Sequence, residues 1–132
     1  MSLHTSNNIS FGKNLYMTSE KTIGRAFPEI GEKILPTAPE IKKIAEKTDT
    51  DIFVKFEKYW YASSDKNSDY VEILVQKTAK NAKQSFKNFV ERLNGFAMKN
   101  RAIYFPNGSS FNSKAMLEEI KVMAERLSKI KI

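Results

Sequence analysis

The chain of 132 residues contains 22 lysine and arginine residues against 15 acids, which gives a formal net charge of +7 at pH 7. This length is typical of one domain, and a hydrophobic content of 41% is sufficient for one core. The sequence has no cysteine, which excludes disulfides, thiolate nucleophiles and cysteine-based zinc sites. No apolar stretch reaches the roughly 18 residues of a membrane span. We therefore expect a soluble protein without a membrane partner, in the cytoplasm or exported from it without disulfides.

Residues 1–19 differ in composition from the rest of the chain. Ser, Thr and Asn are frequent there, and Lys13 is the only fixed charge. Acid-poor, Ser-rich segments of this kind occur both as flexible leaders and as targeting sequences. We expect a polar leader over residues 1–19, in one of these two roles, followed by a single α+β domain over residues 20–132.

Two prolines predict the first helices. Pro28 and Pro39 each precede Glu-Ile, and proline is favoured in the first helical turn, where its missing N–H would have no partner. Thr37 and Glu40 have the spacing of a capping box. The pattern indicates two short N-terminal helices.

The clearest strand pair covers residues 51–61 and 70–77, which are rich in β-branched and aromatic side chains and are joined by a small, polar segment. We expect an antiparallel hairpin in which Trp60 faces Val71, with alternate residues on opposite faces. The predicted core face comprises Ile52, Val54, Phe56, Trp60, Val71, Ile73 and Val75. The other face is amphipathic and comprises Lys55, Glu57, Tyr59, Tyr61, Tyr70, Glu72, Leu74 and Gln76.

The segment 78–108 carries most of the net charge. Its six bases, Lys80, Lys83, Lys87, Arg92, Lys99 and Arg101, stand against one acid, Glu91. Within residues 79–93 apolar side chains recur at helical spacing, at Ala82, Phe86, Phe89, Val90 and Leu93. This spacing predicts a helix that packs its apolar face on the core and presents three lysines as a neighbouring stripe. Residues 101–105 are compatible with a short edge strand that ends at a Pro-Asn-Gly turn.

The last helix is predicted over residues 113–130. Ser110, Asn112 or Ser113 can cap it. Its apolar seam consists of Met116, Ile120, Met123, Leu127 and Ile130. Because this seam spans barely two heptads, we expect it to pack within the monomer, with a dimer seam as the alternative.

The residues that carry chemistry are few. His4 is the only histidine, so Ser-His-Asp catalysis and histidine-ligated metal are not expected, and the acids around the hairpin are typical of solvated turns. The loop 65–69 begins like a calcium-binding loop, but Tyr70 replaces the required glycine and Gln76 the bidentate glutamate. The glycines are too scattered for a phosphate-binding loop. We expect no catalytic residue, no metal and no cofactor.

Two surfaces are candidates for binding. Tyr59, Tyr61 and Tyr70 would form a tyrosine surface of the kind found in protein interfaces, unless the N-terminal helices cover it. The alternative is a nucleic-acid or other polyanion surface of Lys80, Lys83, Lys87, Lys99 and Arg101, interleaved with Phe96, Tyr104 and Phe105. In the simpler interpretation of that surface, its lysines are merely solvated and its aromatic rings close the core.

The sequence therefore predicts an α+β fold with an antiparallel β-hairpin, or a three-stranded sheet, packed against two main helices at 79–93 and 113–130. Its predicted function is that of a small non-catalytic protein-interaction module, binding an unknown protein or a second copy of itself. Nucleic-acid binding is the alternative function.

Overall fold

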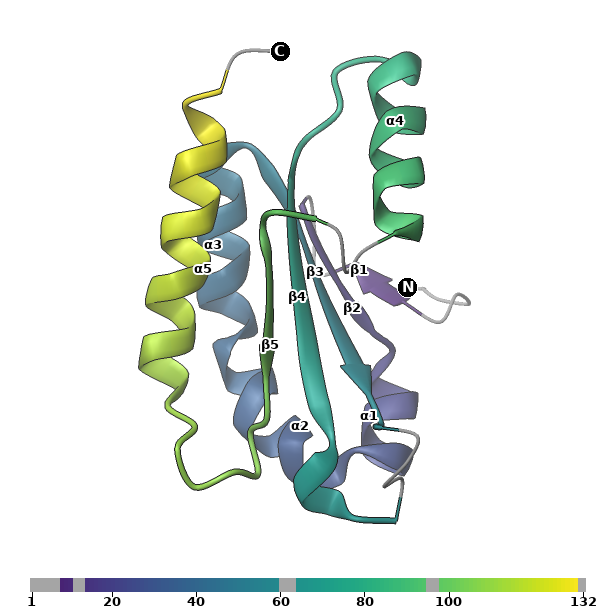
Figure 1. Cartoon of the computed structure of the whole chain (residues 1–132), viewed down its shortest axis with the longest axis vertical. Coiled ribbons are helices and arrows are strands. Elements are labelled where there is room, and N and C mark those ends of the chain that lie inside the picture. The colour runs from purple at the N-terminus through teal and green to yellow at the C-terminus, as the bar shows by residue number, and fades with distance from the viewer. Residues whose placement is uncertain (1–7, 11–13, 60–63, 95–97, 131–132) are drawn as a thin grey trace.

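The computed structural model describes residues 8–10, 14–59, 64–94 and 98–130. In this part of the chain a mixed, mostly antiparallel sheet has α3 and α5 on one side and α4 on the other (Figure 1). The strands, in their order across the sheet, are β1 (Asn8–Ser10), β2 (Leu15–Thr18), β3 (Thr50–Glu57), β4 (Tyr70–Lys77) and β5 (Arg101–Tyr104). The α-helices are α1 (Glu20–Ala26), α2 (Pro28–Ile34), α3 (Ala38–Thr48), α4 (Ala82–Leu93) and α5 (Ser113–Ser128).

The predicted hairpin is present as β3 and β4, but its register differs from the expected one. Phe56, rather than Trp60, pairs with Val71, and Trp60 lies outside the described residues. Strand β3 ends at Glu57, so the connection to β4 is longer than expected. The register changes by an even number of residues, and alternation along a strand has a period of two, so the predicted faces are retained. Ile52, Val54 and Ile73 are fully buried on the core face.

Strand β2 falls within residues 1–19, where we expected a leader. It pairs in parallel with β3, and its Leu15 and Met17 are buried in the core. The connection from β2 to β3 runs through three helices, the first of which begins after Ser19. The Ser19 hydroxyl accepts a hydrogen bond from the Thr22 N–H at 3.2 Å and so caps α1, a helix that the sequence did not predict. Residues 15–18 are therefore part of the folded domain.

The two helices predicted from prolines are α2 and α3, but the predicted capping box is wrong. The 3₁₀ turn Leu35–Thr37 leads α2 directly into α3, and Thr37 has helical backbone angles with no side-chain capping bond. The Thr37 hydroxyl instead donates to the Ile34 carbonyl oxygen at 2.6 Å. The chain runs through this point without the extended residue that a capping box needs.

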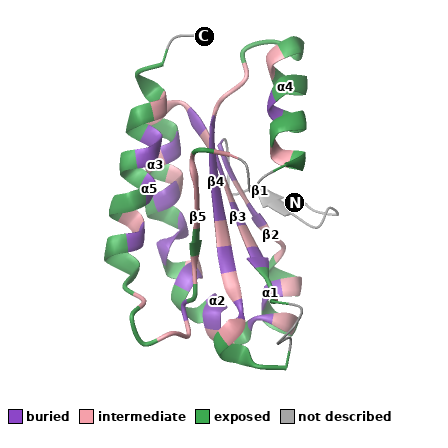
Figure 2. Cartoon of the chain, viewed as in Figure 1, coloured by how far each residue is buried: buried purple, intermediate pink, exposed green. Residues whose placement is uncertain are grey.

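The core lies between the sheet and the helices α1, α2, α3 and α5 (Figure 2). These helices contribute Ile23, Ile30, Ile34, Ile41, Met116 and Ile120, all of which are buried. Helix α5 packs inside the monomer as predicted and is capped by Asn112, whose Oδ1 accepts from the Ala115 N–H at 3.0 Å. The predicted edge strand is β5. With β1 and β2 added, the sheet has five described strands rather than two or three.

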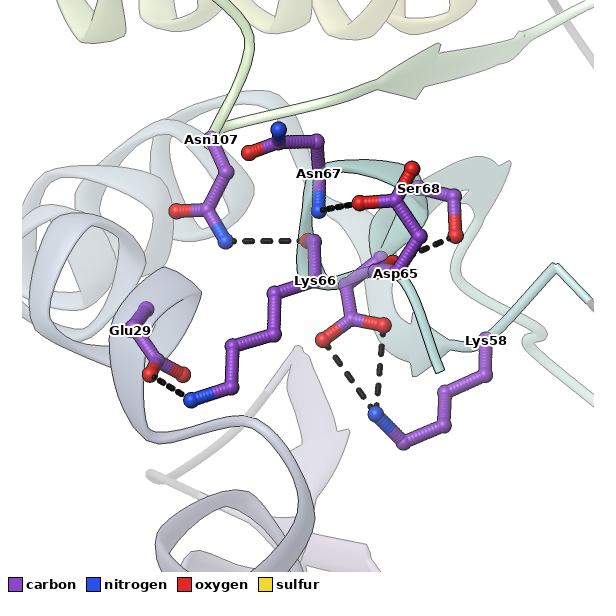
Figure 3. A network of polar contacts seen from close by, with 8 residues as sticks. Glu29, Lys58, Asp65, Lys66, Asn67, Ser68 and Asn107 are labelled. Carbon is purple, nitrogen blue, oxygen red and sulfur yellow. Dashed lines mark hydrogen bonds and ion pairs between the residues drawn. The ribbon is translucent and has the colours of Figure 1, made fainter. Parts of the chain in front are cut away.

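The loop between β3 and β4 is a structural turn tied to its surroundings by polar contacts (Figure 3). Asp65 Oδ1 accepts from the Asn67 N–H and begins the 3₁₀ turn Lys66–Ser68. Asp69, only 2% exposed, forms an ion pair with Lys58 at 3.2 Å. Lys66 pairs with Glu29 of α2 at 2.7 Å, and this contact lowers the pKa of Glu29 and raises that of Lys66. The polar residues of the loop thus join the hairpin to its neighbours.

Helix α4 does not pack as the sequence predicted. Its apolar side chains are exposed, by 67% at Phe86, 48% at Phe89, 46% at Val90 and 71% at Leu93. Asn88, by contrast, is 8% exposed. The expectation that α4 packs its apolar face on the core is therefore wrong, because the helix turns its polar side to the body (Figure 2).

Candidate interaction surface

Helix α4 begins where an asparagine side chain can cap it. Asn81 Oδ1 accepts from the Gln84 N–H at 2.8 Å, and the helix ends at Asn94. The helix is held to β4 chiefly through Gln76, which is 3% exposed. Gln76 Nε2 donates to the Asn88 carbonyl oxygen at 3.0 Å and to Glu91 Oε1 at 2.9 Å. The amide of one strand residue thus contacts two successive turns of α4.

Two further side chains complete this polar attachment. Asn88 Nδ2 donates to the Lys77 carbonyl oxygen at 2.9 Å, and Asn88 Oδ1 accepts from Gln84 Nε2 at 2.9 Å. Arg92 donates to Gln76 Oε1 at 2.8 Å. A buried amide is costly unless its donors and acceptors are paired, and these contacts pair both ends of Gln76. The polar side of α4 is therefore the side that packs against the sheet, because it supplies hydrogen-bond partners for Gln76.

Arg92 also joins α4 to the aromatic side chains on the outer face of the sheet. Its guanidinium lies 4.6 Å from the centre of the Phe53 ring and 6.0 Å from the centre of the Phe89 ring. Phe53 is stacked on Tyr16 at 4.8 Å. Burial and the charge of Asp51 raise the pKa of Tyr16, while Arg92 acts in the opposite direction. The cation–π contact between Arg92 and Phe53 is therefore a second attachment of α4 to the sheet, beside the hydrogen bonds of Gln76.

The consequence of this attachment is an outward-facing apolar ridge, formed by Phe86, Phe89, Val90 and Leu93. Phe86 and Val90 are each two residues from the buried Asn88, and two residues turn a helix by about 200°. Side chains at these positions must point away from the sheet when Asn88 points toward it. The ridge follows the i, i+3, i+4, i+7 spacing of a helix that pairs with another helix.

A cleft of about 600 Å³ lies beside the ridge, between α4, the end of β4 and the C-terminal end of α5. Its apolar lining includes Val90 from the ridge together with Met98, Leu127 and Ile130. Lys99 also lines the cleft and is exposed. Val90 is the residue that the ridge and the cleft share, whereas Gln84, Asn88, Glu91 and Asn94 line the cleft from other sides of the helix.

The basic residues of the predicted polyanion surface differ in their surroundings, since some form ion pairs within the chain and others are exposed. Lys80 forms an ion pair with Asp49, and Arg101 forms one with Glu72. Lys83 and Lys87 are exposed on α4, one turn apart. Phe96 lies outside the described residues. Polyanion binding stays a prediction, with two of its five cations already engaged by acids of the same chain.

Two aromatic residues of that predicted surface make contacts within the chain. The Tyr104 hydroxyl donates to Glu119 of α5, and burial, followed by this bond, raises the pKa of Tyr104. The ring of Phe105 lies 5.7 Å from that of Tyr70, although Phe105 is 48% exposed. These rings pack at the β5 edge of the sheet rather than beside the lysines of α4.

The predicted tyrosine surface is described only in part. Tyr70 is half-buried, and burial raises its pKa. Tyr59 is 42% exposed and follows the end of β3, while Tyr61 lies outside the described residues. The N-terminal helices pack on the core face of the sheet and so do not cover Tyr70 on the other face. The tyrosine surface stays a prediction.

Sequence reasoning missed the outward direction of the ridge. The signal that could have revealed it is the amide character of the other side of α4, where Gln84 and Asn88 are neighbours one turn apart. Amide side chains can hydrogen-bond a sheet while buried, whereas a solvated helix face is usually rich in charge. The corresponding signal in the sheet was Gln76, an amide side chain within a predicted strand that could pair with the amides of the helix.

The part of the chain that the structure describes holds no group of three His, Cys, Asp or Glu side chains arranged for a metal ion. None of its helices combines the length and the apolar character needed to cross a membrane. Comparison with protein-family models, with curated proteins and with solved structures finds no match for this chain.

Proposed function

We propose that this protein is a small, non-catalytic protein-interaction module and that the apolar ridge of α4 is its binding surface. The observation that carries the proposal is the exposure of Phe86 and Leu93, at 67% and 71%, on a helix whose polar side is buried. Contiguous apolar side chains on a monomer commonly mark a protein-binding site. Large aromatic and aliphatic anchors also supply most of the binding energy in such interfaces.

The fixed attachment of α4 supports the same proposal. Hydrogen bonds from Gln76 and Arg92 hold the helix in one orientation, so the ridge is presented before any partner arrives. Binding to a preformed surface avoids the entropy loss of ordering it. A partner would therefore gain most of the free energy of burying the ridge.

The test compares the wild type with Phe86→Ser/Leu93→Ser and with Tyr59→Ser as a matched surface control. Each protein is immobilised and exposed to an extract of the source cells, and the retained proteins are identified by mass spectrometry. The ridge variant should lose specific partners that the wild type and the control retain, while its Tm stays within about 2 °C of the wild type because both side chains are exposed. Retention of the same partners by all three proteins would contradict the proposal. Loss by the Tyr59 variant alone would assign binding to the tyrosine surface.

A further inference from the structure

We infer that the occupant of the ridge is an acidic amphipathic helix of another protein, rather than a second copy of this chain. The inference rests on the proposed function and adds the chemistry of the partner to it. It is carried by the distribution of charge around Phe86, Phe89, Val90 and Leu93, which is basic on the flank of Lys83 and Lys87.

One flank of the ridge carries Lys83 and Lys87, which are i, i+4 neighbours and both exposed. Within the described part of the chain neither lysine has an acidic side chain within ion-pair distance. The other flank carries Ser85 and Arg92, but the Arg92 guanidinium is held against the sheet by Gln76 and Phe53. A helix lying along the ridge would therefore meet positive charge on the side of Lys83 and Lys87.

The acids nearest to the ridge are already engaged. Glu91 is the only acid of α4, and its Oε1 accepts a hydrogen bond from Gln76 on the sheet side. Asp49 forms an ion pair with Lys80, just before the helix. A hydrogen bond from a neutral amide leaves the Glu91 carboxylate charged, but Lys83 and Lys87 outnumber this single acid, so this side of α4 keeps a net positive charge.

This arrangement disfavours pairing of the ridge with a second copy of itself. In an antiparallel pair, Lys83 and Lys87 of one copy would lie beside the same lysines of the other. In a parallel pair, the lysine flank would lie beside the flank of Ser85 and Arg92. Neither orientation brings an acid to a base, and like charges across a helix pair oppose association.

The form of the surface favours a helix as the partner. From Phe86 to Leu93 the ridge rises by about 10 Å, or two helical turns, which matches the contact length of a short amphipathic helix. The adjoining cleft, with Val90 on one side and Leu127 on the other, can receive an apolar side chain from that helix. Acids on one flank of the partner would then lie over Lys83 and Lys87.

The experiment measures binding of three synthetic helical peptides to the purified full chain by fluorescence anisotropy. The peptides share one Leu seam and differ only at the flanking positions, which are Glu, Gln or Lys. The Glu peptide should bind at least tenfold more tightly than the Lys peptide in about 50 mM salt, and higher salt should narrow this difference by screening. Phe86→Ser/Leu93→Ser should abolish binding of all three.

The charge assignment is tested by Lys83→Glu/Lys87→Glu, which should reverse the order of the Glu and Lys peptides. Lys21→Glu/Lys121→Glu is the matched control, because it makes the same charge change at exposed positions on other helices and should preserve the order. Circular dichroism checks that both variants keep the helical content of the wild type.

The outcomes separate the two proposals. Equal binding of the Glu and Lys peptides, or an unchanged order in Lys83→Glu/Lys87→Glu, overturns the acidic partner and leaves the ridge as the binding surface. Absence of peptide binding overturns the proposal of a helical partner. If sedimentation then shows that the wild type is a dimer and that Phe86→Ser/Leu93→Ser is a monomer, the occupant of the ridge is a second copy of this chain. Binding of a single-stranded oligonucleotide that survives the ridge variant, without peptide binding, would assign this region to a polyanion instead.

Discussion

Replacement of Gln76 by leucine tests the physical reason for the orientation of α4. The change replaces a polar side chain by an apolar one of similar volume at a position that is 3% exposed, and it removes three hydrogen bonds to α4. No buried group loses its last partner, because Glu91 and Arg92 reach water and the Asn88 carbonyl stays in the helical hydrogen-bond ladder. The cost of the change should therefore be limited to the loss of the three hydrogen bonds themselves.

The free energy of releasing α4 from the sheet should fall by the sum of these three contributions. Neutral hydrogen bonds contribute roughly 1 kcal/mol each and those to charged groups somewhat more, and the partial exposure of Glu91 and Arg92 reduces the sum to about 2–3 kcal/mol. A free helix of this length is marginal in water, so released α4 should unfold. Hydrogen exchange at the amides of α4 should become roughly 30- to 150-fold faster.

The assay is native-state hydrogen exchange followed by mass spectrometry, with peptides from α4 compared to peptides from β3 and β4. Ser85→Ala is the control, because this exposed α4 residue makes no side-chain bond to the sheet within the described residues. Unchanged protection of α4 in Gln76→Leu would refute the reasoning, since the helix would then be held by something other than this polar network. Loss of protection in the central strands alone, without loss in α4, would refute it as well.

Two further substitutions test the core and the hairpin loop. Ile120→Ala should lower the free energy of unfolding by about 2–5 kcal/mol because Ile120 is fully buried. Ile130→Ala should lower it by less than about 1 kcal/mol because Ile130 is 51% exposed. Urea denaturation measures both values. Lys58→Met should cost about 2–4 kcal/mol because it leaves the carboxylate of Asp69 buried without its ion pair. The double variant Lys58→Met/Asp69→Leu should recover at least half of that loss, and a double variant less stable than Lys58→Met would contradict this account.

Features that depend on neighbouring residues in the chain were predictable. The faces of the hairpin were correct because alternate side chains point to opposite sides of any strand, whatever its register. The seam of α5 was correct from Met116 to Leu127 because these apolar residues recur at the helical period and the start of the helix has an asparagine cap. Ile130, the last predicted seam residue, follows the end of the helix and is 51% exposed. The proline starts of α2 and α3 and the edge strand β5 were likewise local signals.

Features that depend on distant residues were decided by the tertiary structure. The pairing of Phe56 with Val71 and the inclusion of β2 beside β3 are long-range contacts that strand patterns do not specify. The same holds for α4, since its sequence shows that the helix has an apolar and a polar side but not which side meets the sheet. That choice follows from Gln76, a buried strand residue whose amide needs hydrogen-bond partners. The polar side of α4 supplies these partners, so the apolar ridge, which the sequence pattern alone assigns to the core, faces outward.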